Sequence, residues 1–467
     1  MRIIVAGAGL SGLSLCHALQ ERLAASGKAA EITLLESEPR VGGKVQTIKD
    51  DGFLVEWGPN GFLNNKPDTL ELCRKLGIDS LMLPSNDSAR KRYIYAGGKL
   101  HRLPESPPSF IKSGLISWPG KFRLMAEPLI PKKKDSTDET LADFARRRLG
   151  PEALERLIGP MASGVFGGDP ETMSLKSCFP RIYELERDYG GLFRAMLMLM
   201  LKKKKQKAPK GQESGPGGPG GVLTSFEGGL QVLTDSLLGA FKGTVLLGHP
   251  VNRVEQLPGS NGFMVNAGKP GVNMPTDIFI SAAPAYCASG FLAPVDPEIP
   301  EVLGRILYAP MAVVCMGTKL ENIAVPLDGF GFLVGLKEGR RILGTLWDSS
   351  IFPGRAPAGY GSLRSMAGGA ADTVTPALPD EELVGVVSSE LEHIMGLSGR
   401  PGFLKVFKHE KAIPQYTVGH SERLSRLDAL EAKHRGLLFA GNSFRGVGIN
   451  DCVREAYAVA DKAMRLF

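Results

Sequence analysis

A short apolar run at the N-terminus leads directly into a glycine-rich turn. Residues 2–6 read RIIVA and residues 7–12 read GAGLSG, a G-x-G-x-x-G pattern at the start of a predicted helix. A second apolar run over residues 32–35 ends at Glu36. This order of strand, glycine turn, helix, strand and carboxylate is typical of a dinucleotide-binding βαβ unit. We therefore expect the chain to open with a Rossmann-type α/β fold, with a ligand-free glycine-rich turn as the alternative.

Each glycine of this turn has a physical role in holding a nucleotide. Gly7 permits the tight turn, Gly9 lets the backbone approach a pyrophosphate, and Gly12 lets the helix lie close to the sheet. The helix N-terminus then offers free N–H groups to the phosphates. The expected cofactor contacts in this segment are Gly7, Ala8, Gly9, Leu10, Ser11 and Gly12.

The carboxylate at the end of the second run narrows the type of nucleotide. Glu36 would accept hydrogen bonds from ribose hydroxyls and would repel a 2′-phosphate, which argues against NADP. Residues 36–44 read ESEPRVGGK, a carboxylate followed by R-x-G-G. This pattern resembles that of FAD enzymes in the amine-oxidase-like superfamily, where the second glycine pair passes beside the flavin phosphates; the alternative is an ordinary turn. The resemblance implies further FAD contacts at Arg40, Gly42, Gly43 and Lys44.

Composition sets the broad class of the protein. The 467 residues are enough for two or three domains, and 43% hydrophobic residues is ordinary for a soluble protein. The six cysteines and seven histidines are dispersed without metal-ligand spacing, so we expect neither a disulfide frame nor a metal site. The net charge of +7 is modest for this length, and we expect no nucleic-acid partner. Without a signal peptide before the first strand, we expect a cytoplasmic protein or a peripheral one on the cytoplasmic side of a membrane.

One segment in the middle of the chain suggests contact with a lipid surface. Residues 195–201 read AMLMLML and run into Lys202–Lys205, with Lys207 and Lys210 beyond. An apolar helix end must be buried in protein or lipid, and a neighbouring lysine cluster suits anionic headgroups. The alternative is a buried helix followed by a solvated basic loop. Residues 206–221 are rich in glycine and proline and are predicted to form a flexible linker.

The C-terminal part returns to the pattern of the N-terminus. Residues 436–442 read GLLFAGN, a buried type of strand, and a glycine-rich turn and a helix from about Asn450 follow. We therefore expect a discontinuous nucleotide domain in a protein of class α/β plus α+β, with a Rossmann-like FAD domain of the amine-oxidase and p-hydroxybenzoate-hydroxylase type. The predicted domains are an FAD-binding domain (1–85, 222–290 and 434–467), a substrate-binding domain (86–91 and 291–433) and a helical membrane-associated domain (92–205).

Longer motifs make the resemblance more specific. Residues 141–180 contain R-R-R-L-G, then P-x-x-x-G-V-F-G-G-D-P, and end in F-P. Residues 91–95 read KRYIY, residues 329–334 GFGFLV and residues 343–349 LGTLWDS, and residues 440–452 contain AGN and GVGINDC. Together these motifs resemble those of the protoporphyrinogen oxidases, the FAD enzymes of haem synthesis. The likeness covers nearly the whole chain and is weakest in the predicted linker.

The resemblance implies roles for particular substrate-site residues. Arg92 would pair with a substrate propionate, since the guanidinium fork matches a carboxylate. Phe330, Leu333 and Met366 would enclose the macrocycle with apolar surface, and the Gly331 backbone would lie close to it. The alternatives are a surface cation in a basic run for Arg92 and core packing for the apolar residues.

Further cofactor contacts are implied by the same resemblance. Residues 58–61 would pass the flavin ring, and the start of the last helix (447–450) would lie beside the flavin. The strand that contains Val251 would contact the adenine side through its backbone. Cysteine attachment of FAD is not expected, because no cysteine lies shortly before Ala440. The implied contacts are Gly58, Pro59, Asn60, Gly61, Val251, Gly441, Val447, Ile449 and Asn450.

The activity implied by the resemblance is oxidation of protoporphyrinogen IX to protoporphyrin IX with dioxygen, releasing hydrogen peroxide. Flavin N5 would accept hydride without a catalytic side chain, and non-covalent FAD would be the cofactor. A homodimer, contact with a membrane surface and transfer of the product to ferrochelatase also fit this activity. The alternatives are coproporphyrinogen III oxidation, an amine oxidase or carotenoid-desaturase-like flavoprotein, and a non-catalytic membrane scaffold.

Overall fold

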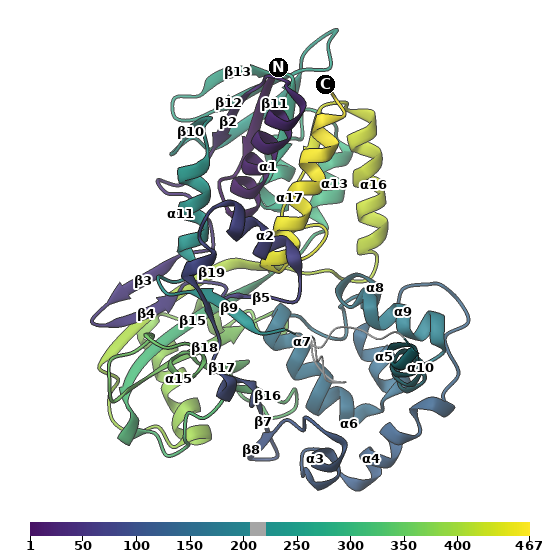
Figure 1. Ribbon diagram of the computed structural model, residues 1–467, viewed down its shortest axis with the longest axis vertical. Helices are drawn as coiled ribbons and strands as arrows, with labels where there is room; N and C mark the ends of the chain where they lie inside the picture. Colours follow the sequence, from purple (N-terminus) through teal and green to yellow (C-terminus); the bar gives the residue numbers. More distant parts are fainter. Residues whose placement is uncertain (206–220) are drawn as a thin grey trace.

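The computed structural model describes residues 1–205 and 221–467 (Figure 1). A five-stranded parallel sheet forms one end of the molecule, and its strand order is β10-β2-β1-β14-β20. These strands come from distant parts of the chain, as the discontinuous-domain prediction requires. They are β1 (Arg2–Ala6), β2 (Glu31–Leu35), β10 (Thr244–Leu246), β14 (Ile278–Ser281) and β20 (Leu437–Phe439).

Both faces of this sheet are covered. Along β1, Ile3 and Val5 lie in one apolar cluster, whereas Ile4 and Ala6 lie in another on the opposite face. Burial on both faces explains why these strands are nearly continuous apolar runs. The first face is covered by α1 (Leu10–Ser26), α11 (Gln231–Ala240) and α17 (Ile449–Met464), with α2 (Pro67–Lys75) against α17. The second is covered by α12 (Ala285–Phe291), α13 (Glu298–Gly304), α16 (His420–Lys433) and the sheet of β11 (Val251–Gln256), β12 (Phe263–Ala267) and β13 (Val272–Thr276).

The second large sheet is mixed and has seven strands, in the order β19-β15-β18-β17-β16-β7-β8. Its pairs are antiparallel except for the parallel pair of β16 with β7. One face packs on α15 (Asp380–Met395) through Leu383, Val387 and Leu391. The strands are β7 (Tyr93–Ala96), β8 (Lys99–Arg102), β15 (Tyr308–Lys319), β16 (Gly331–Val334), β17 (Gly344–Trp347), β18 (Tyr360–Gly368) and β19 (Phe403–Pro414).

Short elements join the two large sheets. The pair β3 (Thr47–Asp50) and β4 (Phe53–Glu56) is antiparallel, and β9 lies between β5 and β6 in a small sheet. A one-turn helix, α14 (Asp348–Ile351), follows β17 directly. The small sheet consists of β5 (Phe62–Leu63), β6 (Met82–Pro84) and β9 (Leu223–Phe226).

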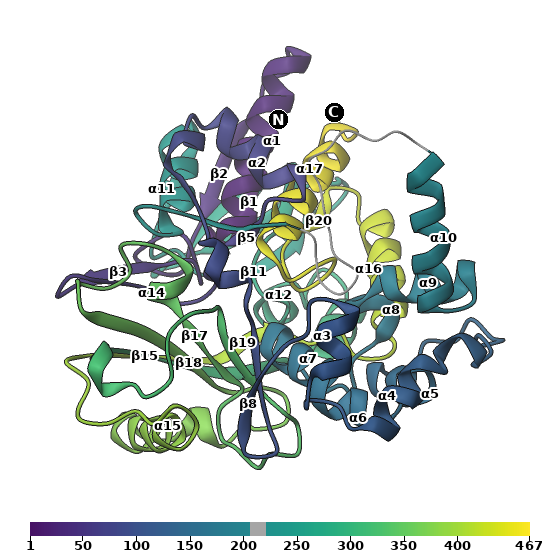
Figure 2. The same cartoon turned by 60° about the horizontal axis from the view of Figure 1, so that its bottom comes forward.

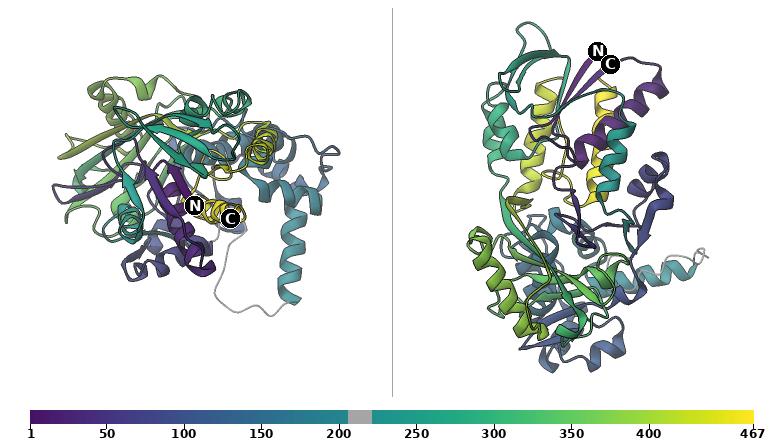
Figure 3. Two further views of the ribbon diagram at one scale, coloured as in Figure 1. Left: turned by 90° about the horizontal axis from the view of Figure 1, so that it is seen from above. Right: turned by 90° about the vertical axis from the view of Figure 1, so that its left-hand side faces the viewer.

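A helical part lies beside the seven-stranded sheet, and its last helix projects from the molecule (Figures 2 and 3). Buried Glu127 anchors that helix, because its carboxylate accepts the N–H groups of Leu192 and Phe193 and pairs with buried Arg148 at 3.2 Å. The helices are α3 (Pro107–Lys112), α4 (Trp118–Met125), α5 (Leu141–Arg148), α6 (Pro151–Ala153), a π-helical turn (Leu154–Ile158), α7 (Gly159–Phe166), α8 (Leu175–Cys178), α9 (Pro180–Tyr189) and α10 (Leu192–Lys205).

Two predicted boundaries differ from the structure. The helical part begins at α3 and not at residue 92, because Gly97 and Gly98 have φ of 60° and 77° and turn the chain into the β7–β8 hairpin. Helices α13 and α16, predicted in the substrate segment 291–433, pack on the five-stranded sheet through an apolar face. The predicted linker, residues 206–221, lies outside the described residues except for Gly221, as do Lys207 and Lys210.

Candidate active site

The N-terminal glycine turn has the close contacts that the sequence predicts. Gly7 has φ of 101°, and a Cβ there would lie 3.1 Å from the Ala282 carbonyl. A Cβ on Gly12 would overlap the Gly7 carbonyl oxygen, so helix α1 lies directly on the turn. Gly9 caps α1 without a side-chain hydrogen bond. The first N–H groups of α1 are therefore free of a capping side chain and suited to a phosphate.

Glu36 lies beside this turn at the end of β2. Its side chain is buried and accepts the Ala8 N–H at 2.7 Å and the Glu38 N–H at 3.0 Å. The His249 N–H donates to the Glu36 carbonyl at 2.7 Å, which places the chain just before Val251, the first residue of β11, next to Glu36. The predicted ribose and adenine contacts thus lie together.

The second glycine pair packs against the first turn. The Gly42 N–H donates to the Ala8 carbonyl at 2.8 Å, and a Cβ on Gly43 would lie 3.2 Å from the Gly9 Cα. The Arg40 guanidinium donates to the Gly43 carbonyl at 2.9 Å and lies over the Trp57 ring. The R-x-G-G segment (residues 40–43) and the first turn (residues 7–12) therefore form one surface lined by backbone, which we call the glycine wall.

Lys44 points away from this wall toward the end of β19. Its ammonium donates to the Lys411 carbonyl at 2.7 Å and to the Ala412 carbonyl. Burial lowers the pKa of Lys44 to about 8. Lys44 thus contributes its backbone, and not its ammonium, to the glycine wall.

The predicted flavin segment, residues 58–61, packs closely on its neighbours. A Cβ on Gly58 would overlap the Lys44 carbonyl oxygen, and one on Gly61 would lie 2.5 Å from the Thr224 carbonyl oxygen. The Arg364 guanidinium donates to the Gly58 carbonyl at 2.7 Å. Pro59 is half-buried and Asn60 is buried. The segment therefore lies between the R-x-G-G segment and the seven-stranded sheet.

The C-terminal motif reaches the same edge of the five-stranded sheet. Gly441, with φ of 116°, follows β20, and a Cβ there would lie 3.6 Å from the Ala282 carbonyl. Val447 is half-buried, and Ile449 and Asn450 are buried at the start of α17. The Asn450 amide donates to the Leu63 carbonyl at 2.9 Å, which ties α17 to the chain just after the predicted flavin segment.

Sequence reasoning missed the residue that holds the loop before α17. The Tyr416 hydroxyl donates to the Asn442 carbonyl at 2.6 Å and accepts the Gly446 N–H at 2.8 Å. Its ring stacks on His420, whose Nε2 donates to the Phe444 carbonyl at 2.7 Å. No signal in the local sequence separates these two residues from ordinary core residues.

Burial lowers the pKa of His420 to about 4, which predicts a pH-dependent stability. Because an unfolded histidine has a pKa near 6.5, the unfolded chain takes up this proton first as the pH falls. The contribution of neutral His420 to the free energy of unfolding is expected to be complete above about pH 6.5. It should fall by at most roughly 3 kcal/mol as the pH is lowered to 4. Urea unfolding at stepped pH should show this slope, and it should flatten in His420→Gln. An equal slope in that variant would assign the effect to other groups.

A row of residues crosses four strands on one face of the seven-stranded sheet. Ile94 of β7 pairs with Leu333 of β16. Leu333 also pairs with Gly344 of β17, which in turn pairs with Met366 of β18. Paired residues on neighbouring strands share a face. Leu333 and Met366, predicted to enclose a substrate, therefore lie on the same face, and both are half-buried.

A parallel row lies two residues along each strand. Gly331 pairs with Leu346, and Leu346 pairs with Arg364. Phe332 points to the opposite face and packs in the cluster under α15. The face with Gly331, Leu333 and Met366 is thus the one that contacts the predicted flavin segment through Arg364.

Helix α7 meets this face at Leu333. A Cβ on Gly164 would overlap the Leu333 side chain, so the absence of a side chain on Gly164 permits the contact. The predicted alternative of core packing is present in part, since Phe330 packs beside Phe352 and Met366 packs beside Val313. All of these predicted substrate residues except Gly331 nevertheless keep partial exposure.

Arg92 differs from the rest of its basic run. It directly precedes β7 and is exposed, with its guanidinium 5.5 Å from the centre of the Phe330 ring. Lys91 pairs with Asp328 at 2.6 Å and Arg90 with Asp87 at 3.3 Å. No ion pair forms at Arg92 within residues 1–205 and 221–467. Of these neighbouring cations, Arg92 is the one available to an incoming carboxylate.

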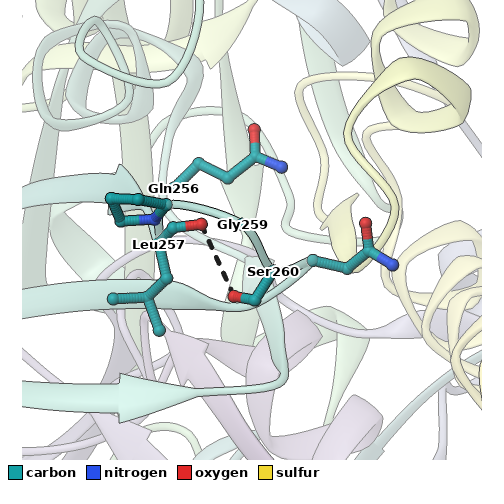
Figure 4. A pocket seen from close by; sticks show the side chains of 6 residues that line it. Gln256, Leu257, Gly259 and Ser260 are labelled. Carbon is teal, nitrogen blue, oxygen red and sulfur yellow. Dashed lines mark hydrogen bonds between the residues drawn. The ribbon is translucent and has the colours of Figure 1, made fainter.

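Three observations concern other kinds of site. The pocket in Figure 4 lies at the β11–β12 turn, is lined by residues 256–261 and carries no ionisable side chain. In the described part of the chain, no three His, Cys, Asp or Glu side chains gather as a metal site would require. None of the helices described has the length and apolar character needed to cross a bilayer.

Comparison with known proteins identifies the family to which this chain belongs. The model of the flavin containing amine oxidoreductases matches residues 10–464. The chain belongs to this family. Membership in a flavin family confirms the predicted cofactor class, and the glycine wall, the uncapped N-terminus of α1 and buried Glu36 fit an FAD molecule.

Relatives within the flavin amine oxidoreductases cover almost the full chain. Coproporphyrinogen III oxidase of Bacillus subtilis is 30% identical over 99% of this chain and 97% of its own. Protoporphyrinogen oxidase 1 of Arabidopsis thaliana chloroplasts is 31% identical over 98% of this chain and 87% of its own. The crystal structure of a provisionally named protoporphyrinogen oxidase from Exiguobacterium sp. 255-15 superposes with a TM-score of 0.83, covering 99% and 98% of the two chains. At 24% identity, this last similarity concerns the fold alone.

Proposed function

We propose that this protein oxidises protoporphyrinogen IX to protoporphyrin IX with dioxygen as the electron acceptor. The observation that carries the proposal is the placement of Arg92, whose guanidinium has no ion-pair partner among the described residues, beside a half-buried apolar sheet face next to the flavin segment. A porphyrinogen is an apolar macrocycle with carboxylates at one edge, and this arrangement matches both features. The names of the relatives support the same substrate class.

The side chains would act by binding and orientation. Arg92 would hold a propionate, and Phe330, Leu333 and Met366 would exclude water from the macrocycle. Bound FAD supplies the hydride acceptor. Each pair of hydrogens removed from the macrocycle reduces one dioxygen to hydrogen peroxide, so the electrons balance. Pyrrole N–H protons can pass to water, and the reaction requires no basic side chain.

Coproporphyrinogen III is the second candidate substrate, because one relative is named for its oxidation. This substrate carries two more propionates than protoporphyrinogen IX. Lys91 and Arg90, the cations beside Arg92, already have carboxylate partners. We therefore favour the substrate with fewer carboxylates.

Parallel turnover of the two porphyrinogens tests this proposal. Purified protein loaded with FAD would receive each porphyrinogen under anaerobic conditions, followed by air, with porphyrin fluorescence and peroxide measured together. We expect a higher kcat/KM for protoporphyrinogen IX and one peroxide per hydrogen pair. Reversed values would favour coproporphyrinogen III, equal values would contradict a preference for protoporphyrinogen IX, and porphyrin without peroxide would overturn oxygen as acceptor. Failure to bind FAD at all would support a scaffold.

We also propose that the helical part rests on an anionic membrane surface. Helix α10 projects from the molecule (Figure 3), and along it Leu197, Met198 and Leu201 are 59%, 52% and 52% exposed. Ala195 is buried, but most of the residues that follow it along the helix are exposed, which supports a membrane contact over a buried helix. Exposed Lys202 follows these apolar residues and suits anionic headgroups.

Flotation with phosphatidylglycerol vesicles checks the membrane proposal. Changing Leu197, Met198 and Leu201 together to serine removes three apolar side chains, each contributing at least about 1 kcal/mol when buried in lipid. We expect vesicle binding to fall about 100-fold. The control is serine at Leu307 and Val374, which are 61% and 66% exposed but lie outside the helical part. Equal binding by wild type and the α10 variant at low salt would contradict the proposal.

A further inference from the structure

A buried ion pair lies directly beneath the predicted flavin segment, and nothing in the proposed reaction uses it. Arg364 on β18 and Asp348 at the start of α14 approach to 3.1 Å, with side-chain exposures of 3% and 2%. Both residues belong to the seven-stranded sheet and its connections, and not to the five-stranded nucleotide sheet. Burying two charges costs several kcal/mol per ion before pairing, so such a pair contributes little stability by itself.

Both members of the pair reach into the flavin segment. The Arg364 guanidinium donates to the Gly58 carbonyl at 2.7 Å. The Asp348 carboxylate accepts from the Asn60 amide nitrogen at 3.1 Å. The pair therefore contacts two residues of a four-residue segment, and it ties the substrate-side sheet to the cofactor side.

These contacts determine which way the Asn60 amide faces. Asn60 presents its nitrogen to Asp348 and its oxygen elsewhere, as suits a carboxylate that is paired with Arg364 and accepts hydrogen bonds. That oxygen is buried and finds no hydrogen-bond partner among the residues that the structure describes. A buried acceptor without a donor is unfavourable by about 1–3 kcal/mol. A ligand donor at this position would satisfy it.

We propose that Asp348 and Arg364 are positioning residues that fix the Gly58–Gly61 segment and aim the Asn60 carbonyl oxygen at an N–H or O–H donor of bound FAD. Asp348 acts through Asn60, and Arg364 acts through the Gly58 carbonyl. The inference rests on the flavin of the proposed function, but it does not depend on the porphyrinogen. It therefore predicts changes in the bound flavin itself.

A double-mutant cycle between Asp348 and Asn60 tests this inference. FAD dissociation would be measured by flavin fluorescence, and the visible flavin absorption band would be recorded for wild type, Asp348→Asn, Asn60→Leu and the double variant. We expect Asp348→Asn to raise the FAD dissociation constant about tenfold and to shift the band. In the Asn60→Leu background, the same change should have little further effect, since its path to FAD is gone.

The control is Ser365→Ala on the same strand. Ser365 shares a buried hydrogen bond with Thr345 at 2.9 Å on the opposite face of the sheet, so its loss lowers stability without touching the segment. It should lower the melting temperature and leave the flavin band in place. If Asp348→Asn fails to fold, Asp348→Asn with Arg364→Gln removes both charges and takes its place in the cycle.

Three outcomes would overturn the inference. These are an unshifted flavin band, an unchanged FAD dissociation constant, or effects of Asp348→Asn that add fully to those of Asn60→Leu. Failure of the proposed function appears differently: wild type would bind FAD and turn over neither porphyrinogen, while the cycle would still report coupling.

Discussion

Replacing Arg92 with alanine is expected to lower kcat/KM for the porphyrinogen about 10- to 100-fold, because a charge-assisted hydrogen bond contributes roughly 1.5–3 kcal/mol. The guanidinium has no carboxylate partner within the described residues, so its removal leaves no buried charge behind. The folded protein should therefore keep its melting temperature and its FAD. Steady-state kinetics on FAD-loaded enzyme measures the effect.

Two companion variants distinguish a specific contact of Arg92 with the substrate from a nonspecific effect of positive charge. Arg90→Ala removes a neighbouring cation that is 71% exposed and already paired with Asp87, and it should leave kcat/KM unchanged. Arg92→Lys keeps the charge but loses the bidentate fork, and an intermediate value is expected. Equal losses in Arg90→Ala and Arg92→Ala would show that the basic run acts only through its overall charge.

Gly12→Ala is expected to raise the FAD dissociation constant at least tenfold. Its new Cβ would overlap the Gly7 carbonyl oxygen, which is backbone and cannot swing aside as a side chain can. Helix α1 must then move away from the turn, and overpacking of this kind costs about 1–3 kcal/mol. The displaced helix end no longer presents its N–H groups to the phosphates. Retained flavin, measured by absorbance after gel filtration, reports the loss.

Gly239→Ala provides the matched control for that substitution. Gly239 lies within α11, beside α1, and nothing lies within 4 Å of a Cβ built there. Alanine favours a helix over glycine by about 1 kcal/mol, so this variant should be as stable as wild type or more so. Both variants change glycine to alanine in neighbouring helices. Flavin loss in both would contradict the local clash as the cause.

The nucleotide part could be predicted because its signal is local. The first turn, Glu36 and the R-x-G-G segment all lie within residues 7–44, and their spacing alone indicates the βαβ unit. The structure brings these residues together through short hydrogen bonds such as Gly42 N–H to the Ala8 carbonyl. A long-range fold is not needed to recognise them.

The positioning residues could not be predicted, because their partners are distant in sequence. Asp348 and Asn60 are 288 positions apart, and Arg364 and Gly58 are 306 apart. A charged residue in a strand also looks like a solvated one until the sheet packing is known. The LGTLWDS motif includes Asp348, but its likeness to a family carries no role for that side chain.

The predicted boundary at residue 92 differs from the structure for a related reason. Strand β7 is only four residues long and pairs with β16, which lies more than two hundred residues later. Such a short strand has little periodicity of its own and its partner strand is distant in sequence, so local patterns do not indicate it. The same pairing aligns Ile94 with Leu333, and thereby determines which side chains share a face with Arg364.

The order of strands in the nucleotide sheet has a consequence for biosynthesis. Strand β20 and helix α17 pack onto elements made from the first residues of the chain, and α17 lies along α1. During translation, the apolar surface of α1 that α17 covers therefore stays exposed until residues 437–464 have been synthesised. We therefore expect flavin to bind only after this segment has been synthesised, and chains truncated before it to be colourless when purified.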